Sequence, residues 1–530
     1  MIKKIYIFIL TIINRIRINR SEHDFIEHNK KLSNQKYHED NIVLIEMIGL
    51  QSNHIAISYL SRILTEMNNA QLIGYKPRLS LSIFNKLKSF IIEKKLKKIF
   101  ESFGMTKILN IDIDINSKTL ANQLKNKLMS QIKSKSDVHL LTVDNIWVGD
   151  LIYDQYLKSN MVPTLDIKSK DFEELMFEFC LLFNYWQGVF SKNKVRALII
   201  SHACYFMGLP ARIAFKFNIQ VYQASLENIY CLTKYNLHPS SEFHSYKSDF
   251  EKLDIKIKDK AIIRARERLN LIYEGNINVD QPYIKNSAYN QKKPLGKVIH
   301  NNKPIKILIA PHCFFDSPNG LGKNLFPDFY EWLDFIAKLS IKTDYEWYIK
   351  THPNTFPENK LVIKDFVSRY PKINFLNDEI SHNQLIDEGI NIVLTVYGSI
   401  GLEYAAKNIT VINASQNNPH ISFDFNIHPK SKEELKNIIL NLHNYVNASL
   451  YSDDIYKCYY MKYLHYKEDI FISDYKSVVK HMGGYYDALF TSKIYDFWLN
   501  YWSKDIHSHI NKTLKEFVLS GEYKMKSKWR

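Results

Sequence analysis

A glycine-containing turn is the part of the sequence whose residue types point most directly to chemistry. The stretch "LTVYGSIGLEYAAKNITVINA", residues 394–414, passes from an apolar segment through Gly398, Ser399, Ile400 and Gly401 into helix-forming residues. Backbone N–H groups at the start of such a helix, the helix dipole and the Ser399 hydroxyl can bind a phosphate without a dedicated cation. The turn predicts an anion site; the alternative is tight packing, since strand-to-helix turns need glycine anyway.

Two further side chains fit a nucleotide at this turn. Glu403 lies one turn into the helix, where a carboxylate can accept hydrogen bonds from ribose hydroxyls or simply complement the helix dipole. His352 follows the apolar segment "YEWYIK" and comes two residues after Lys350. A histidine there can bind a phosphate, with Pro353 stiffening the turn; the other interpretation is a surface loop histidine.

The loop after the apolar segment "IKILIAPH" carries more polar candidates. His312 ends that segment, and "DSPNGLGKN", residues 316–324, follows it. This loop lacks the Gly-Lys-Ser/Thr ending of a P-loop, so we expect it to line a cleft, with Lys323 near the ligand. His420, in "NASQNNPHISFDF", lies where it could contact sugar hydroxyls.

Candidate acids and bases lie in the first half of the chain. Glu46 ends the apolar segment "NIVLIE", Asp150 follows Gly149, and His202 follows "VRALIIS". Each can serve as a general acid or base at a sheet edge, or can be a helix cap or a solvated loop residue.

An acidic pair, Asp112 and Asp114 in "NIDIDI", has the D-x-D spacing of metal-binding carboxylates. Its alternation with isoleucine is more typical of a strand with one solvated face, so we predict no metal site.

Alternating apolar segments indicate the elements that position these residues. Residues 41–77 form a strand, helix, strand pattern, residues 106–112 a strand, residues 172–190 a long helix, and residues 195–224 a second strand, helix, strand pattern. The first half therefore predicts an α/β sheet lobe.

The alternation restarts at residue 305 and continues to residue 414. We predict strands at 305–312, 345–353, 373–376, 390–399 and 409–414, and helices at 329–340, 360–370, 381–388 and from residue 401. This order predicts a parallel, doubly wound sheet, and ligands bind such sheets at the carboxyl ends of the strands.

The predicted organisation has five parts. A basic, amphipathic segment, residues 1–40, precedes an N-terminal α/β lobe, residues 41–275. A linker rich in Asn, Lys and Pro, residues 276–304, leads to a C-terminal α/β lobe, residues 305–430, and a helical region, residues 431–530.

Composition restricts the class of protein. Hydrophobic residues make up 45% of the 530 residues, which indicates a globular protein. Lys and Arg (71) outnumber Asp and Glu (55), giving a formal net charge of +16 and favouring anionic partners. The basic residues are spread along the chain and no recognition motif appears, so we expect no nucleic-acid partner.

Five scattered cysteines indicate neither a disulfide framework nor a zinc site, and fit a reducing cytoplasm.

The N-terminus, "MIKKIYIFILTIINRIRINR", has a basic start and an apolar run that is far shorter than the ~20 residues needed to cross a bilayer. No signal-peptide cleavage site follows it. We interpret it as an interfacial segment or, equally, as an ordinary first helix or leader.

Two stretches, "YIKTHPNTFPENK" and "LIDEGINIVLTVYGSIGLEYAAKNITVINA", resemble the C-terminal lobe of bacterial capsule and surface-polysaccharide glycosyltransferases. This group includes Kdo transferases and sialyltransferase-like enzymes with a His-Pro motif, and the resemblance covers residues 305–430. It implies a GT-B fold of two Rossmann-like lobes and a nucleotide-activated sugar, often a CMP-sugar, with His352 and Ser399 at the donor phosphate. The resemblance also implies that the N-terminal lobe, residues 41–275, is the acceptor side and that the C-terminal lobe, residues 305–430, binds the nucleotide sugar.

One feature departs from that family. Its sialyltransferase-like members carry an acidic pair followed by glycine before the His-Pro motif, whereas Asp387-Glu388-Gly389 follows it here. We interpret these residues as a helix stop, which leaves the catalytic residue unassigned by motif.

The sequence thus predicts a metal-independent glycosyltransferase that uses a nucleotide sugar and no separate cofactor. We expect an acceptor that is a lipid-linked or growing glycan, and a cytoplasmic protein that is peripheral on the inner membrane, at its anionic surface. A nucleotide-sugar epimerase of the same fold and a non-catalytic nucleotide-binding assembly module are the alternatives.

Overall fold

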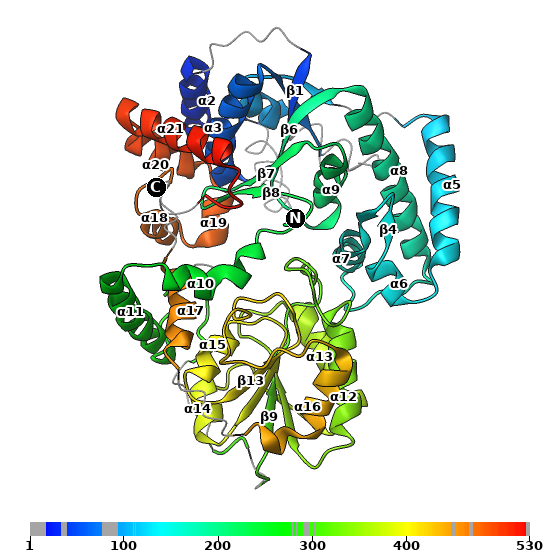
Figure 1. The fold of residues 1–530 in the computed structure, drawn as a ribbon, viewed down its shortest axis with the longest axis vertical. Helices are drawn as coiled ribbons and strands as arrows, with labels where there is room; N and C mark the ends of the chain where they lie inside the picture. Colours follow the sequence, from blue (N-terminus) through cyan, green and yellow to red (C-terminus); the bar gives the residue numbers. More distant parts are fainter. Residues whose placement is uncertain are drawn as a thin grey trace, which may run out of the picture.

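The chain folds into two α/β lobes, one above the other (Figure 1). The computed structural model describes residues 17–32, 40–76, 94–109, 111, 113–277, 279–281, 284–289, 296–299, 303–446, 452–465 and 470–525. Most of the predicted N-terminal segment, part of the predicted linker, and Asp112 lie outside these residues. The two separate sheets confirm the predicted fold class.

The N-terminal lobe is built on a six-stranded sheet in the order β3-β2-β1-β6-β7-β8. All neighbouring strands are parallel except β7 and β8, which are antiparallel. The central strands are rich in Val, Ile and Leu because helices cover both of their faces. The strands are β1 (Asn41–Glu46), β2 (Gln71–Tyr75), β3 (Met105–Leu109), β6 (Lys194–Ile200), β7 (Gln220–Ala224) and β8 (Ile229–Leu232), with the hairpin β4 (Thr142–Val143) and β5 (Ile146–Trp147) outside the sheet.

Helices pack on both faces of this sheet. One face is covered by α3 (Gln51–Asn68) and the other by α7 (Gly149–Asn160), α8 (Lys170–Lys192) and α9 (Leu209–Lys216). The same lobe also contains α5 (Ile115–Gln131), α6 (Lys135–His139) and η1 (Tyr205–Gly208).

Asp114 departs from its predicted position. The sequence placed it on a solvated strand, but the strand ends at Leu109 and the Asp114 carboxylate caps α5, accepting a hydrogen bond from the Ser117 N–H at 2.7 Å. An aspartate suits a helix N-cap as well as a solvated strand position, so its alternation with isoleucine could not distinguish the two.

The C-terminal lobe holds a five-stranded sheet in the order β11-β10-β9-β12-β13 in which all neighbours are parallel. The chain reverses its direction of winding between β9 and β12, at the middle of the sheet. The strands are β9 (Lys306–Ile309), β10 (Glu346–Lys350), β11 (Ile373–Leu376), β12 (Ile392–Thr395) and β13 (Thr410–Asn413), and the helices are α12 (Phe329–Ser340), α13 (Pro357–Arg369), α14 (His382–Asp387), α15 (Ile400–Ala405), α16 (Lys432–Leu440) and η3 (Leu442–Asn444). The α14 helix ends at Asp387 and Gly389 has φ +97°, as the helix-stop interpretation predicted.

Helices form part of the segments that join the lobes. The chain leaves the first lobe through η2 (Ser241–Ser245), α10 (Tyr246–Glu251) and α11 (Ile255–Tyr273), and α17 (Asp454–Tyr463) packs against α10 and α11 on its way back.

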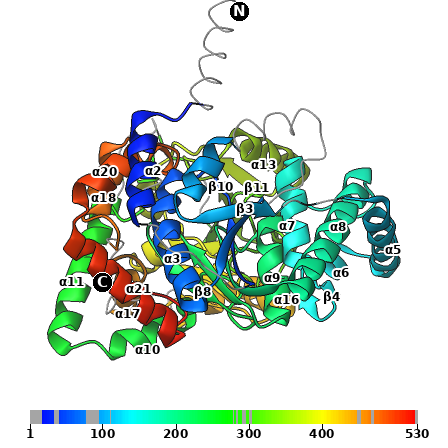
Figure 2. The same cartoon turned by 90° about the horizontal axis from the view of Figure 1, so that it is seen from above.

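The last helices return to the first lobe. They are α18 (Tyr475–His481), α19 (Tyr485–Leu489), α20 (Lys493–Tyr501) and α21 (Lys504–Ser520). They share one apolar core with α2 (Arg20–Leu32) and α3, and Figure 2 shows α18, α20 and α21 grouped with α2. Buried Tyr495 of α20 stacks on Phe25 of α2, and its hydroxyl lies 2.6 Å from Nδ1 of His54 in α3. The region predicted as residues 431–530 is therefore divided between the two lobes.

A loop of the C-terminal lobe docks on the N-terminal lobe beside α7. The Tyr153 and Thr164 hydroxyls donate to Oδ2 of Asp328 at 2.6 and 2.7 Å. In the same junction, Nδ2 of Asn319 donates to Oδ1 of Asp154 at 2.8 Å. All five side chains are buried or half-buried, so this junction fixes how the lobes meet along this edge.

Within the described residues, no helix is both long enough and apolar enough to cross a membrane.

Candidate functional site

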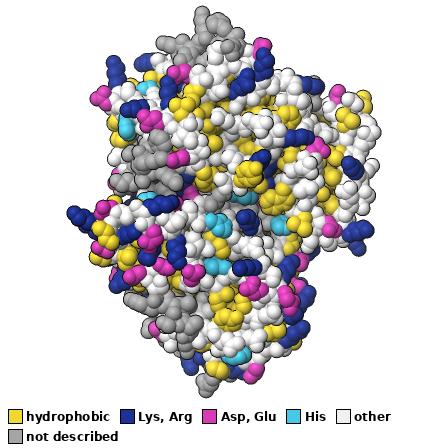
Figure 3. All heavy atoms as spheres, in the orientation of Figure 1, with side chains coloured by type: hydrophobic (Ala, Val, Ile, Leu, Met, Phe, Trp, Pro, Cys, Tyr) yellow, Lys and Arg dark blue, Asp and Glu magenta, His cyan; other side chains and the backbone are white. Residues whose placement is uncertain are grey.

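A cavity of about 520 Å³ opens at the carboxyl ends of β9, β10 and β12, where the winding of the C-terminal sheet reverses. Parallel sheets bind ligands at this position because several strand ends and loops converge there. Figure 3 shows histidine and basic side chains gathered in the middle of one face, between the lobes. Seven of the predicted binding residues line the cavity: His312, Lys350, His352, Gly398, Ser399, Ile400 and Glu403.

His312, at the end of β9, fixes the turn that follows β12. Its Nε2 accepts hydrogen bonds from the backbone N–H groups of Val396 and Tyr397, both at 3.3 Å. Burial lowers the pKa of His312 to about 4, so the ring is neutral at pH 7 and can accept. The ring also stacks on Phe329, with centroids 4.9 Å apart. His312 therefore shapes the cavity wall as a hydrogen-bond acceptor and carries no charge to a ligand.

Lys350, at the end of β10, brings a cation to the cavity. Its Nζ is 3.3 Å from Nε2 of His382, whose Nδ1 is 2.7 Å from the Tyr404 hydroxyl. Burial lowers the pKa of Lys350 to about 8, so it is mostly protonated at pH 7. Burial and the Lys350 charge hold the pKa of His382 well below its usual range, which leaves that ring neutral and able to accept. No ion pair joins Lys350 to a carboxylate among the described residues.

His352 lies beside Lys350 with an exposed side chain. Its Nδ1 accepts a hydrogen bond from the Asn354 N–H at 3.1 Å, which leaves the proton of the neutral ring on Nε2. The surrounding protein, and then the Lys350 charge, lower the pKa of His352. The side chain can therefore donate one hydrogen bond from Nε2 to an anion.

The turn from Gly398 to Gly401 borders the cavity at one end and is tightly packed at the other. Gly398 and Ser399 line the cavity, whereas Gly401 does not. A Cβ on Gly401 would lie 2.4 Å from Cε1 of His420, which is fully buried, so only glycine fits there. Asn426 also donates to the Gly401 carbonyl at 3.1 Å. The expectation that His420 contacts sugar hydroxyls is wrong, because its ring packs inside the lobe against this glycine.

Glu403 reaches the cavity from α15. Its Oε2 accepts a hydrogen bond from the Tyr289 hydroxyl at 2.8 Å. Burial raises the pKa of Glu403, while the Tyr289 and Ser399 hydroxyls and the charge of Lys462 act in the opposite direction. A carboxyl group held in this way can accept hydrogen bonds from ligand hydroxyls.

Most residues that line the cavity were not found from the sequence, and three of them have side chains suited to binding a ligand. Tyr289 comes from the linker, Phe356 from the loop after β10, and Lys462 from α17. Burial lowers the pKa of Lys462 to about 8, with Cys458 and Glu403 opposing the shift. Neither the composition of the linker nor the tyrosine-rich sequence of α17 indicates that these segments fold back to the edge of the sheet. Only Phe356 could have been found from its position, because it follows closely after the His-Pro pair.

Lys323 lies apart from these residues. It is exposed, has φ +55°, and its carbonyl accepts a hydrogen bond from the Gln416 N–H at 2.9 Å. It is not among the residues that line the cavity.

The three acid and base candidates belong to the N-terminal lobe and do not line this cavity. Glu46 is 1% exposed and accepts a hydrogen bond from the Ser201 N–H at 2.5 Å, which ties the end of β1 to the end of β6. Both carboxylate oxygens of buried Asp150 accept from Arg212, at 3.2 and 2.6 Å, which joins α7 to α9. These contacts give Glu46 and Asp150 structural roles.

His202 differs from the other two candidates. It is half-buried after β6, and burial lowers the pKa of its ring while the charge of Asp316 acts in the opposite direction. Asp316 belongs to the loop after β9 and accepts a hydrogen bond from Tyr205 at 2.8 Å. His202 therefore lies where this loop of the C-terminal lobe meets the N-terminal lobe.

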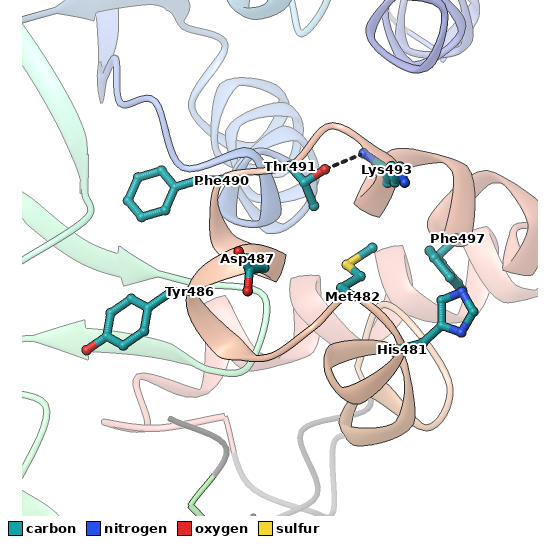
Figure 4. A pocket seen from close by; sticks show the side chains of 8 residues that line it. All are labelled: His481, Met482, Tyr486, Asp487, Phe490, Thr491, Lys493 and Phe497. Carbon is teal, nitrogen blue, oxygen red and sulfur yellow. Dashed lines mark hydrogen bonds between the residues drawn. The ribbon is translucent and has the colours of Figure 1, made fainter. Parts of the chain in front are cut away.

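A second hollow, of about 510 Å³, lies among the C-terminal helices α18, α19 and α20 (Figure 4). Tyr486 and Phe490 project to one side of it, and the rings of His481 and Phe497 meet at the other. Asp487 is the one carboxylate among its lining residues, and none of the predicted site residues lies there.

No protein-family model and no curated protein sequence matches the chain. Among solved structures, it is similar to Thermosulfurimonas dismutans KpsC, a beta Kdo 2,4 transferase, at 13% identity and TM-score 0.30, over 50% of this chain and 80% of that one. It is also similar to a Rickettsia africae glycosyltransferase, at 9% identity and TM-score 0.23, over 92% and 100% of the two chains. A UDP-GlcNAc 2-epimerase from Neisseria meningitidis bound to UDP-GlcNAc gives 11% identity and TM-score 0.22, over 79% and 97%. Similarities this distant assign neither activity nor substrate.

Proposed function

We propose that the protein is a glycosyltransferase that moves a sugar from a nucleotide-activated donor to a surface-polysaccharide acceptor. The observation that supports this most directly is the cavity at the winding reversal of the C-terminal sheet, where the ends of β10 and β12 contribute Lys350, His352 and Ser399. An ammonium, an imidazole N–H and a hydroxyl are the groups that bind phosphate oxygens. Two stacked α/β lobes provide the second surface that an acceptor needs.

The donor is proposed to lie along this cavity with its phosphate at Lys350, His352 and Ser399. Glu403, held by the Tyr289 hydroxyl, is proposed to accept from the ribose hydroxyls. Lys462 approaches from α17 and adds a second cation. CMP-sugars are one donor class to test.

His202 is the proposed general base that takes the proton from the acceptor hydroxyl. Its lowered pKa leaves the ring neutral at pH 7, as a base requires, and it lies at the edge where the two lobes meet. Glu46 and Asp150 are occupied by Ser201 and Arg212, which favours His202 among the three.

The acceptor is proposed to be a lipid-linked or growing glycan at the cytoplasmic face of the inner membrane. The formal net charge of +16 supports this proposal, because anionic lipid headgroups attract a basic protein surface.

The proposal is tested first by donor binding. Calorimetric titration with CMP, UDP, GDP and dTDP should identify at least one ligand. His352→Ala and Ser399→Ala should each weaken that ligand by about 1 to 3 kcal/mol, the usual value of a hydrogen bond to a charged group. Unchanged affinity in both variants would contradict the site assignment.

Turnover then separates the possible reactions. The matching nucleotide sugar is incubated with and without a lipid-linked glycan fraction, and the products are analysed by mass spectrometry. Transfer that needs the acceptor supports a glycosyltransferase, and His202→Ala should abolish transfer while donor affinity is kept. Epimerised nucleotide sugar formed without acceptor, or binding without any turnover, would contradict the proposal.

A further inference from the structure

One aromatic side chain of the cavity is exposed without an apparent structural reason. Phe356 lines the cavity and is 53% exposed, and it is the one residue among the cavity-lining side chains that belongs to the exposed large hydrophobic residues. Its ring makes no aromatic contact with another side chain in the described part of the chain. Exposing a large apolar ring to water is unfavourable, so a ligand that covers it gains binding free energy.

The backbone that carries the Phe356 ring is held in place. Phe356 is the N-cap residue of α13, with extended backbone, and Pro357 occupies the first turn. Its carbonyl accepts hydrogen bonds from the N–H groups of Asn359 at 3.1 Å and Lys360 at 3.4 Å. Because the backbone is already ordered, the segment loses little backbone entropy when a flat group stacks on the ring.

The preceding loop is anchored as well. The Thr355 N–H donates to the His352 carbonyl at 2.9 Å. The Asn354 amide exchanges hydrogen bonds with the backbone of Asn286, at 2.9 and 3.2 Å. These bonds hold the phosphate-binding histidine and the exposed ring on one short, ordered segment, so both can contact the same ligand.

We propose that Phe356 is the stacking platform for the nucleobase of the donor. This inference rests on the proposed function and assigns the two ends of the nucleotide. The phosphate lies at Lys350 and Ser399, and the base lies on Phe356 at the other end of the 352–356 segment. Every nucleobase has a flat face, so this platform should strengthen the binding of all nucleotides without selecting among them.

Calorimetry with two groups of ligands tests the proposal. The nucleotides are CMP, CDP, UDP, GDP and ADP, and the base-free ligands are ribose 5-phosphate and inorganic pyrophosphate. Phe356→Ala should weaken every nucleotide that binds by roughly 5- to 150-fold, the range of one base–aromatic stack, and should leave base-free ligands unchanged. Phe356→Trp should restore nucleotide affinity, whereas Phe356→Leu, which keeps an apolar side chain but removes the flat face, should not.

Phe375→Ala is the matched control, because Phe375 is a partly exposed phenylalanine of the same lobe that does not line the cavity. It should leave both groups of ligands unaffected. Unchanged nucleotide affinity in Phe356→Ala, or an equal loss for base-free ligands, would overturn the platform and leave the proposed function standing. If no nucleotide binds the unaltered protein, the proposed function falls and this inference falls with it.

Discussion

At the scale of single residues, two lysine ammonium groups line the cavity, and both change their protonation state close to neutral pH. Burial lowers the pKa values of Lys350 and Lys462 to about 8, against 10.5 for a solvated lysine. Neither forms an ion pair with a carboxylate in the described residues, so an anionic ligand is the partner that would offset the cost of burying them. Their charge is present at pH 7 and is lost as the pH rises through 8.

Nucleotide affinity should therefore fall as the pH rises from 7 to 9, since nucleotide phosphates are already almost fully ionised at pH 7 while the lysines lose their protons over this range. Lys350→Met and Lys462→Met should each weaken nucleotide binding at pH 7 by about 1.5 to 3 kcal/mol and reduce its pH dependence. Calorimetry at three pH values measures both effects. Lys364→Met, an exposed lysine on α13, is the control and should bind as the unaltered protein does. A pH dependence that both lysine variants retain would contradict this assignment.

Gly401 allows a second prediction at this scale. The closest atoms to an added Cβ belong to His420 and Asn426, at 2.4 and 2.9 Å, and both side chains are buried. Gly401→Ala should lower the free energy of unfolding by about 1 to 3 kcal/mol, as overpacking does, and should lower the midpoint of thermal unfolding.

Gly188→Ala is the matched control for this change. Gly188 lies inside α8 with nothing within 4 Å of its added Cβ. Alanine should stabilise that helix by about 0.5 to 1 kcal/mol. Equal unfolding midpoints for the two variants would show that the space around Gly401 can relax.

At the scale of elements, the alternation of strands and helices was predictable and the position of the connecting segments was not. The predicted helix at 329–340 matches α12, and the predicted strands enclose β9, β10, β12 and β13. Buried parallel strands leave long apolar runs, and the residues after them must lie at one edge of the sheet, so His312, Lys350 and Ser399 could be grouped from the sequence.

Residues from outside the sheet could not be grouped in this way. Tyr289 and Lys462 reach the cavity because the linker and α17 fold back over the strand ends. Such returns depend on tertiary packing, which no local periodicity records. The same limit explains Asp150 and Glu46. A carboxylate near a strand or helix end looks alike in sequence whether it faces a ligand or, as here, Arg212 or the Ser201 backbone.

At the scale of the whole molecule, the two lobes are joined by a buried carboxylate. Asp328 accepts from Tyr153 and Thr164 of the other lobe and from the Glu331 N–H of its own helix, at 2.6, 2.7 and 2.6 Å. Burial raises the pKa of Asp328 to about 6 despite these three donors. The Asp328 carboxyl at this junction therefore changes its protonation state near pH 6, where stability can be measured.

Stability should respond to pH through this residue. The folded pKa of about 6 lies above the unfolded value of 3.8, so the folded state binds more protons between these values. The contribution of Asp328 to stability is present below pH 4 and is lost as the pH rises through 6. The stability of the unaltered protein, measured relative to Asp328→Asn, should therefore decrease as the pH rises from 4 to 7. The decrease should be equivalent to about 1 to 3 kcal/mol and is followed through the midpoint of thermal unfolding. A constant difference across this range would contradict the raised pKa.

The return of the last helices to the first lobe bears on how the chain is made. Residues 41–75 leave the ribosome early, but the apolar side of α3 is covered by helices that begin only at residue 475. The lobe that is synthesised first is therefore completed only after the second lobe has been made, and the apolar side of α3 stays exposed until the helices from residue 475 onward have emerged. Nascent chains of this protein should accordingly depend on chaperones until residues 475–520 have emerged, and the second lobe, whose sheet is contiguous in sequence, should reach its folded form before the first.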